Sequence, residues 1–208
     1  MEPSSQQTSS QNTFKTVAEL QGQADMIRST LQECILSYPR GDSTINNPTV
    51  TDLGVTRRNY PINPDSTHFT SATPGRSGDQ LVRNIRCPGN NPGGANQANH
   101  AVMFGGNSGK FLPPAPDLFE EWQYYNGTDG VFFWTFTDKT DAFITSALTK
   151  LDENFSECEA DVISGTDPDL DSDSTYQCAT GTICFRVRMT TTGTAIWNGD
   201  IDNDESSC

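Results

Sequence analysis

The clearest pattern in the chain is an apolar stripe near its N-terminus. Apolar residues recur there at steps of three and four, the spacing of one face of a helix. The stripe consists of Val17, Leu20, Ala24, Ile27, Leu31, Cys34 and Tyr38, and the opposite face carries Lys15, Glu19, Gln23, Arg28 and Gln32. Thr13 is a suitable N-cap, and Pro39 ends the pattern. We expect a helix over residues 14–38 that packs one side on a sheet; a coiled-coil segment is the alternative.

The regions around this helix are polar or rich in turn residues. Residues 1–12 predict a disordered polar lead, and residues 39–116, with many Gly, Pro and Asn, predict a loop-rich region. Leu118, Phe119, Trp122 and Tyr125 have helical spacing, which favours a short helix or turn. Asn126 and Gly127 then predict a hairpin-type turn.

A strand, a second helix and C-terminal strands follow. Residues 131–136 are the most strand-like run, and the apolar face from Phe143 to Cys158 predicts a helix that starts near 138–140, so that strand and helix together occupy 130–160. Residues 161–177 read as an acidic loop. Alternation predicts a half-buried strand at the start of 182–198: Ile183, Phe185, Val187 and Met189 face inward, and Cys184, Arg186, Arg188 and Thr190 face outward. A last strand at 194–197 and a tail complete the chain.

Together these elements predict an α+β fold. Residues 13–208 form one domain, in which the long N-terminal helix packs on a small antiparallel sheet, with a second helix and long disulfide-pinned loops. The chain is long enough to bury a core of this size.

The six cysteines bear on the compartment. They are Cys34, Cys87, Cys158, Cys178, Cys184 and Cys208, with no C-x-x-C pair among them. This even, widely spaced set predicts up to three disulfides of open connectivity, with a reactive free thiol as the alternative. Disulfides place the chain in an oxidising compartment: the periplasm, the cell surface or the medium. The sequence carries no signal peptide or apolar span, so hydrophobic residues are expected upstream of Glu2.

Charge and motifs narrow the function. The net charge of −14 argues against binding nucleic acid or an anionic membrane surface. No G-x-S-x-G elbow is present, and the run from Gly105 to Lys110 lacks the spacing of a phosphate-binding loop. We therefore expect no enzymatic activity; a periplasmic hydrolase with an unrecognised site is the least favoured alternative.

Two ladders of aspartates are candidate calcium ligands. They are Asp167, Asp169, Asp171 and Asp173, and near the C-terminus Asp200, Asp202 and Asp204. Calcium binds several carboxylate oxygens that converge from a tight loop, and alternating Asp residues supply them. Ser172 and Cys178 replace the Gly and Glu of a complete EF-hand loop. A solvated acidic loop is the alternative.

The helix from Val17 to Tyr38, with its run QADMIRSTLQECILSY, resembles the soluble half of the N-terminal helix of type IV pilins and type II secretion pseudopilins. The polar loops, small sheet and cysteine-pinned C-terminal region fit the same outline. In that family a hydrophobic N-terminal half-helix anchors the subunit in the inner membrane and later forms the filament core. Major pseudopilins also hold calcium in an acidic loop near the C-terminus. The second helix at 140–158 would be an insertion.

The resemblance implies a non-enzymatic, pilin-like subunit of a cell-envelope filament or of a secretion or adhesion apparatus. Its partners would be other pilin-like subunits, and its native chain would carry a basic leader and about 20 apolar residues upstream of residue 2. The implied assembly helix uses Val17, Leu20, Ala24, Ile27, Leu31 and Tyr38. The alternative is a secreted, calcium-assisted binding or adhesion module that recognises a surface glycan or protein.

Overall fold

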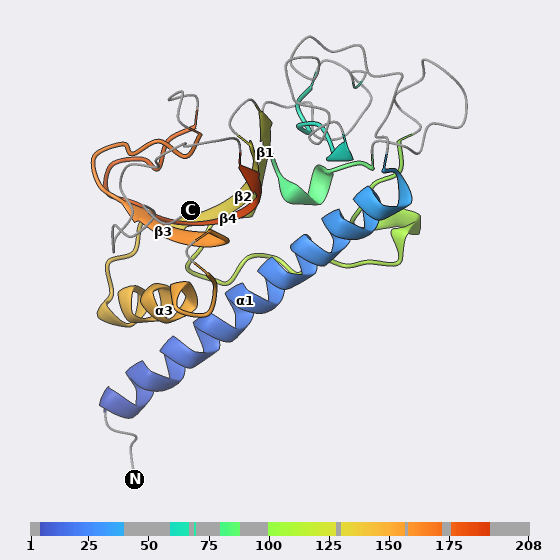
Figure 1. Cartoon of the computed structure of the whole chain (residues 1–208). Coiled ribbons are helices and arrows are strands. Elements are labelled where there is room, and N and C mark those ends of the chain that lie inside the picture. Colours follow the sequence, from blue (N-terminus) through green and yellow to red (C-terminus); the bar gives the residue numbers. More distant parts are fainter. Residues whose placement is uncertain are drawn as a thin grey trace.

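The computed structural model describes residues 5–39, 59–66, 69, 80–87, 100–127, 130–156, 158–171 and 176–191. These residues form two α-helices, α1 (Ser5–Ser37) and α3 (Ala142–Asp152), and four strands, β1 (Gln123–Gly127), β2 (Gly130–Thr137), β3 (Ala160–Ser164) and β4 (Ile183–Thr191). The predicted α+β architecture, with a long N-terminal helix, a second helix and a small antiparallel sheet, is confirmed. Figure 1 shows both helices on the same side of the sheet.

Helix α1 begins nine residues before the predicted start. Residues 5–12 are helical, and 6–12 are exposed, so the prediction of a disordered lead is wrong for 5–12. They contain no Gly or Pro, and a helix that packing has nucleated extends cheaply through such residues. Thr13 is therefore not the N-cap; its hydroxyl lies within the helix and donates to the carbonyl of Ser9. The helix ends at Ser37, just before Pro39.

The apolar stripe of α1 is the centre of the main core. Leu20, Ala24, Ile27 and Leu31 are at most 1% exposed, and they pack with residues of α3 and the sheet. Gln23, expected in solvent, is buried as well. Its Oε1 accepts a hydrogen bond from Trp122 Nε1 at 2.7 Å, and its Nε2 donates to the carbonyl of Pro114 at 2.8 Å. One amide thus fixes α1 to the segment that leads into β1.

The sheet has the order β1-β2-β4-β3, and all three pairings are antiparallel. Strand β1 replaces the short helix or turn expected before residue 126. Asn126 and Gly127, predicted to form a turn, belong to this strand and pair with Val131 and Gly130. The helical spacing gave a wrong prediction here. Tyr124 and Tyr125 are adjacent in sequence and lie on opposite faces of a strand, so both are buried.

The region expected to be loop-rich, 39–116, contains only short elements where the structure describes it. These are the 3-10 turns η2 (Val82–Asn84) and η4 (Gly106–Ser108), and isolated bridges from Leu81 to Gln123 and from Arg86 to Val102.

Helix α3 and strand β3 differ from the sequence prediction. The helix starts after Asp141 and ends at Asp152, so Phe155 and Cys158 lie beyond it, although Phe155 still packs on the core. The chain then forms β3, which lies at the beginning of the predicted acidic loop 161–177. A strand with Asp161 at its second position shows no apolar alternation, which is why the sequence pattern missed it.

Strand β4 occupies the predicted position but is buried on both faces. Phe185 and Val187 face the helices, as expected. Cys184, Arg186 and Arg188, expected in solvent, are at most 5% exposed, because that face carries a second apolar cluster. In it Leu170, Tyr176 and Cys178, from the chain between β3 and β4, pack with Tyr125, Phe132 and Trp134 of the sheet. The predicted last strand at 194–197 lies outside the described residues.

Candidate functional site

Two disulfides are resolved in the described chain. Cys34 at the end of α1 is bonded to Cys87, and Cys178 in the loop before β4 is bonded to Cys184 within β4. Cys158 is also disulfide-bonded, and Cys208 lies outside the described residues. The prediction of a disulfide-pinned domain is confirmed for these bonds.

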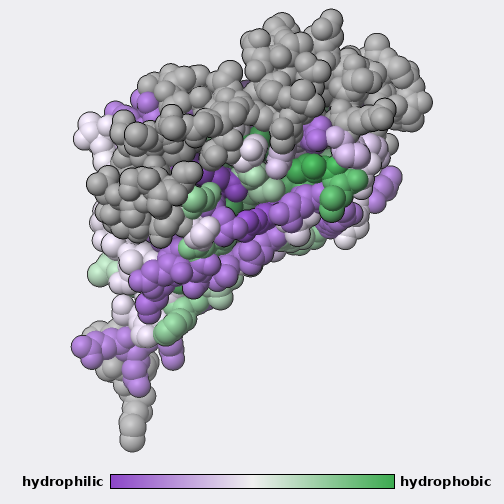
Figure 2. All heavy atoms as spheres, viewed as in Figure 1, coloured by the Kyte–Doolittle hydropathy of each residue, from purple (hydrophilic) through white to green (hydrophobic). Residues whose placement is uncertain are grey.

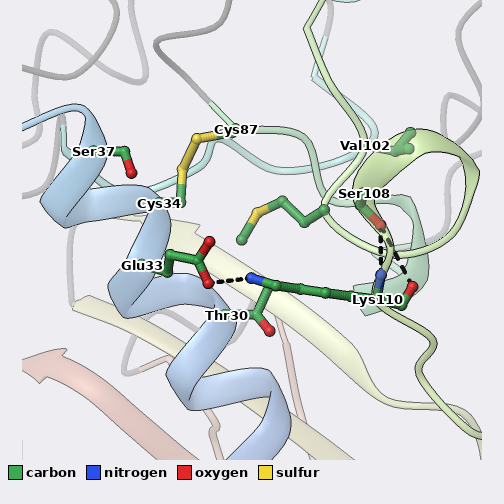
Figure 3. A pocket seen from close by; sticks show the side chains of 9 residues that line it. Thr30, Glu33, Cys34, Ser37, Cys87, Val102, Ser108 and Lys110 are labelled. Atoms are coloured by element: carbon green, nitrogen blue, oxygen red, sulfur yellow. Dashed lines mark hydrogen bonds and ion pairs between the residues drawn. A yellow bond between two sulfur atoms is a disulfide. The ribbon is translucent and has the colours of Figure 1, made fainter.

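The first disulfide borders a small hollow of about 180 Å³ at the C-terminal end of α1 (Figure 3). Lys110, from the glycine-rich run, reaches across it and pairs with Glu33 of α1. Ser108 accepts a hydrogen bond from the Lys110 backbone N–H at 3.2 Å. The lysine is therefore engaged in tying the loop to α1, a structural role.

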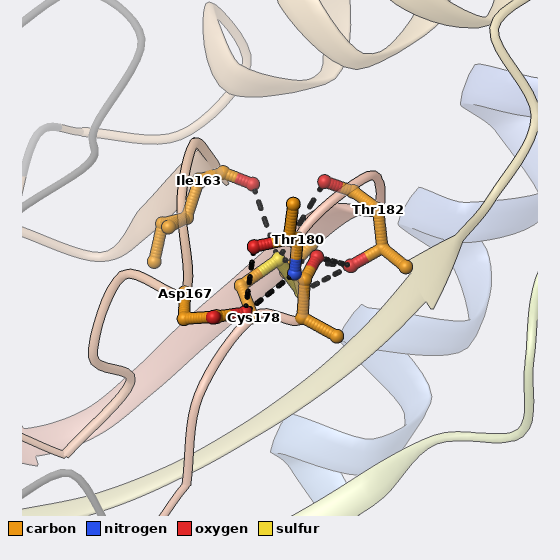
Figure 4. Close-up of a disulfide and its surroundings, with 7 residues drawn as sticks. Ile163, Asp167, Cys178, Thr180 and Thr182 are labelled. Carbon is orange, nitrogen blue, oxygen red and sulfur yellow. Dashed lines mark hydrogen bonds between the residues drawn. A yellow bond between two sulfur atoms is a disulfide. The ribbon is translucent and has the colours of Figure 1, made fainter.

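The second disulfide fixes the loop that holds the first aspartate ladder (Figure 4). Asp167, which has a positive φ of 49°, accepts hydrogen bonds from the backbone and hydroxyl of Thr180 at 2.6 and 2.9 Å. Asp169 accepts from the Gln177 side chain at 3.1 Å, and the buried Asp171 accepts from the backbone of Tyr176 at 3.2 Å. Each of these three carboxylates thus holds the loop together.

The described residues contain no group of three or more His, Cys, Asp or Glu side chains that is suited to a metal ion. Asp173, Asp200, Asp202 and Asp204 lie outside the described residues. Calcium binding stays a prediction of the sequence.

A buried ionic cluster, which the sequence pattern did not indicate, lies beneath the loop. Asp161 of β3 accepts from Arg186 at 2.8 and 3.2 Å and pairs with Arg188 at 3.0 Å. Arg186 is fully buried and also donates to the carbonyl of Leu170 at 3.1 Å. The cluster therefore joins β3, β4 and the loop. A signal was present in the sequence, since two arginines alternate within an otherwise apolar strand in an acidic protein.

The residues predicted as the assembly helix are core residues of this domain. Leu20, Ala24, Ile27 and Leu31 are buried, and Val17 and Tyr38 are partly buried against the same core. They are not available to a second subunit. Any contact between subunits through α1 must use its other faces.

The open side of α1 borders a groove next to the proline-rich segment 113–117. It is about 490 Å³ in volume and is lined by Lys15, Ala18, Glu19, Gly22, Gln23, Met26, Pro113, Pro114, Ala115, Pro116 and Asp117. Toward the helix N-terminus a second hollow of about 240 Å³, which shares four of these residues, continues to Phe143 of α3. The outer face of α1 is mostly hydrophilic (Figure 2).

Glu159 and Tyr124 are two of the described groups whose surroundings shift their pKa values. Glu159 precedes β3 and accepts a hydrogen bond from Arg28 of α1, which lowers the pKa of its carboxyl. Burial raises the pKa of Tyr124 well above 10, and its hydroxyl donates to the carbonyl of Pro61. Both groups fix the sheet to neighbouring segments.

Among the described residues, no helix is both long enough and apolar enough to span a bilayer. Comparison with known proteins finds no family model, no curated protein and no solved structure that matches the chain.

Proposed function

We propose that the chain is a non-enzymatic, pilin-like subunit of a cell-envelope filament or secretion apparatus, and that neighbouring subunits contact it along the open side of α1. One observation supports this above the others. Helix α1 is 33 residues long, yet among its described side chains only one stripe is buried, and its first turns extend past α3 and the sheet (Figure 1).

The length of α1 supports an assembly role because a domain of this size does not need it. A helix of 33 residues is about 50 Å long. The first buried position among its described side chains is Thr13, so roughly two turns of helix precede the first buried residue. A polar, exposed helical extension of this kind adds no core. It can instead connect the domain to an upstream segment or to another subunit.

The groove beside α1 supports the same proposal. Ala18 and Gly22 are exposed small residues, which let another backbone approach closely, and the prolines 113, 114 and 116 keep the opposite wall stiff. Lys15 and Glu19 put both signs of charge at one end of the groove. This mixture suits contact with an element of the same composition, such as a neighbouring copy.

The cysteines support export. Disulfides persist in the periplasm and outside the cell and are rare in the cytosol. The proposal also includes an anchoring segment upstream of residue 2, as the resemblance to pilins implies. The coding sequence that precedes Met1 tests this part: a basic leader followed by about 20 apolar residues supports it, and a start codon at Met1 with no such segment contradicts it.

Photo-crosslinking tests the assembly contact. A benzoylphenylalanine placed at Ala18, in the groove, is expected to give crosslinked dimers and a ladder of multimers in the cells that naturally make the protein. The same group at Thr166, exposed on the loop over the opposite face of the sheet, is the matched control and is expected to give monomer. Monomer from both positions, in cells that form surface filaments, would overturn the proposal.

A further inference from the structure

A separate hollow, of about 330 Å³, lies on the face of the sheet turned away from α1 and α3. It is lined by Gln80, Gln123, Trp134, Phe136, Tyr176, Gln177, Ala179, Thr182 and Cys184. None of these nine side chains carries a formal charge, although the chain as a whole has a net charge of −14. Its volume is at the lower end of the range of about 300–1,000 Å³ that small-molecule sites occupy.

Aromatic rings form one part of the wall. Trp134 and Tyr176 lie with their ring centroids 5.5 Å apart, and Phe136 and Tyr176 are both only partly buried. The ring centroids of Tyr176 and Tyr125 are 5.0 Å apart, so neighbours on the sheet hold the Tyr176 ring in place. Rigid, partly exposed rings offer flat apolar surfaces to an occupant.

Three glutamine side chains and a threonine provide polar groups around the rings. Gln80 is 4% exposed, and its Nε2 donates to Asp65 Oδ1 at 2.7 Å and to the hydroxyl of Tyr176 at 2.6 Å. Its Oε1 is buried and has no hydrogen-bond partner within the described part of the chain. The Gln80 amide is thus held beside the Tyr176 ring, and the less buried amides of Gln123 and Gln177 are the ones that an occupant can reach.

We propose that this hollow binds an uncharged saccharide. A pyranose ring combines an apolar face of C–H groups, which packs on aromatic rings, with a rim of hydroxyls that donate and accept hydrogen bonds. The rings of Phe136 and Tyr176 suit the first, and the amides of Gln123 and Gln177 suit the second. A charged ligand would find no opposite charge in the wall.

The site does not depend on the proposed assembly through α1. It is built from β1, β2, the start of β4, the loop before β4 and Gln80, whereas the groove lies along α1 on the other side of the sheet. A subunit assembled through α1 would keep the saccharide site uncovered by that contact. A failure of one proposal therefore leaves the other standing.

Binding is tested on the full chain with neutral trisaccharides of glucose, galactose, mannose and N-acetylglucosamine. Tryptophan fluorescence reports occupation directly because Trp134 lines the hollow, and calorimetry gives the dissociation constant. We expect saturable binding of at least one probe and no binding of trigalacturonic acid. The absence of saturable binding by all four neutral probes would overturn the proposal, as would tighter binding of the charged one.

Two variants locate the binding. Phe136→Leu removes a ring from the wall and is expected to weaken binding about tenfold, within the range for one aromatic contact. Gln123→Ala removes an amide and is expected to weaken it about fivefold. Phe111→Leu and Gln32→Ala, both at exposed positions outside the hollow, are the matched controls. Equal losses in variants and controls would contradict the assignment, and unchanged thermal unfolding shows that each variant is folded.

Discussion

The two faces of the sheet are covered in different ways. On one face, α1 and α3 bring rows of apolar residues onto Tyr124, Phe133 and Phe185. On the other face, the described residues between β3 and β4 add Leu170, Tyr176 and Cys178 to the apolar cluster. They are held by Arg186, which pairs with Asp161 and donates to the carbonyl of Leu170, and by a disulfide. A helix satisfies its own backbone and presents an apolar stripe, whereas a loop does neither. A loop can therefore cover a sheet only with specific polar and covalent anchors.

The largest loss of stability is expected from the removal of Asp161, which belongs to the loop-covered face. Asp161→Ala leaves Arg186 buried without this carboxylate, and we expect the free energy of unfolding to fall by about 3–5 kcal/mol in urea denaturation. Glu159→Ala removes a carboxylate two residues earlier that is 40% exposed and pairs with Arg28. This control should cost at most about 1 kcal/mol. Equal losses would contradict the anchoring role of the buried cluster.

The two faces of the sheet also differ in the length of chain that their disulfides close. Cys34 and Cys87 are 53 residues apart and join the end of α1 to the segment before Val102, whereas Cys178 and Cys184 are 6 apart. Replacing each pair by alanine should cost about 4 and about 2 kcal/mol respectively, because a longer closed loop restricts the unfolded chain more. A larger loss for the short loop, measured by urea denaturation, would show that this bond stabilises the native loop itself.

Apolar packing should be equally tight on both faces. Ile144 of α3 and Ile163 of β3 are each 0% exposed, on opposite sides of the sheet. Ile144→Val and Ile163→Val each remove one methyl group and should cost about 1 kcal/mol. A much smaller loss at Ile163 in the same urea series would show that the loop-covered face is loosely packed.

The smallest effect appears only in alkali and concerns the helix-covered face. The folded-state pKa of Tyr124 is raised above its unfolded value of 10, so its contribution to stability is complete below pH 10 and is lost as the pH rises through the folded pKa. Ultraviolet titration at 295 nm should show the last of the five tyrosines ionising together with unfolding, later than Tyr60, whose pKa burial raises less. Tyr124→Phe should remove this late step, and its persistence would assign the step to another tyrosine.

The sequence predicted elements whose apolar pattern is local and missed those that depend on distant partners. The apolar stripe of α1 and the alternation of β4 could be recognised because each pattern repeats within its own element. Strand β3 was not recognised, because Asp161 becomes acceptable in a buried strand through Arg186 and Arg188, which lie 25 or more positions later. For the same reason the arginines of β4 were placed in solvent.

The candidate sites were predictable to different degrees. The cysteines were recognisable as disulfide partners by their number, although the pairing was not. The saccharide hollow collects residues from positions 80 to 184, and no local motif contains them. The exposed side of α1 could be read from its polar residues, but the groove depends on the position of Pro113 and its neighbours.

The position of β4 in the sheet has a consequence for biosynthesis. This strand pairs with both β2 and β3, yet it is the last described element to be synthesised. The sheet cannot close until about residue 191 has emerged, and until then Leu20, Ile27 and Leu31 of α1 lack their final cover. Non-local pairing of this kind is slow and leaves apolar surface open to aggregation. An early bond between Cys34 and Cys87 would hold α1 beside its future neighbours while the rest of the chain is being made.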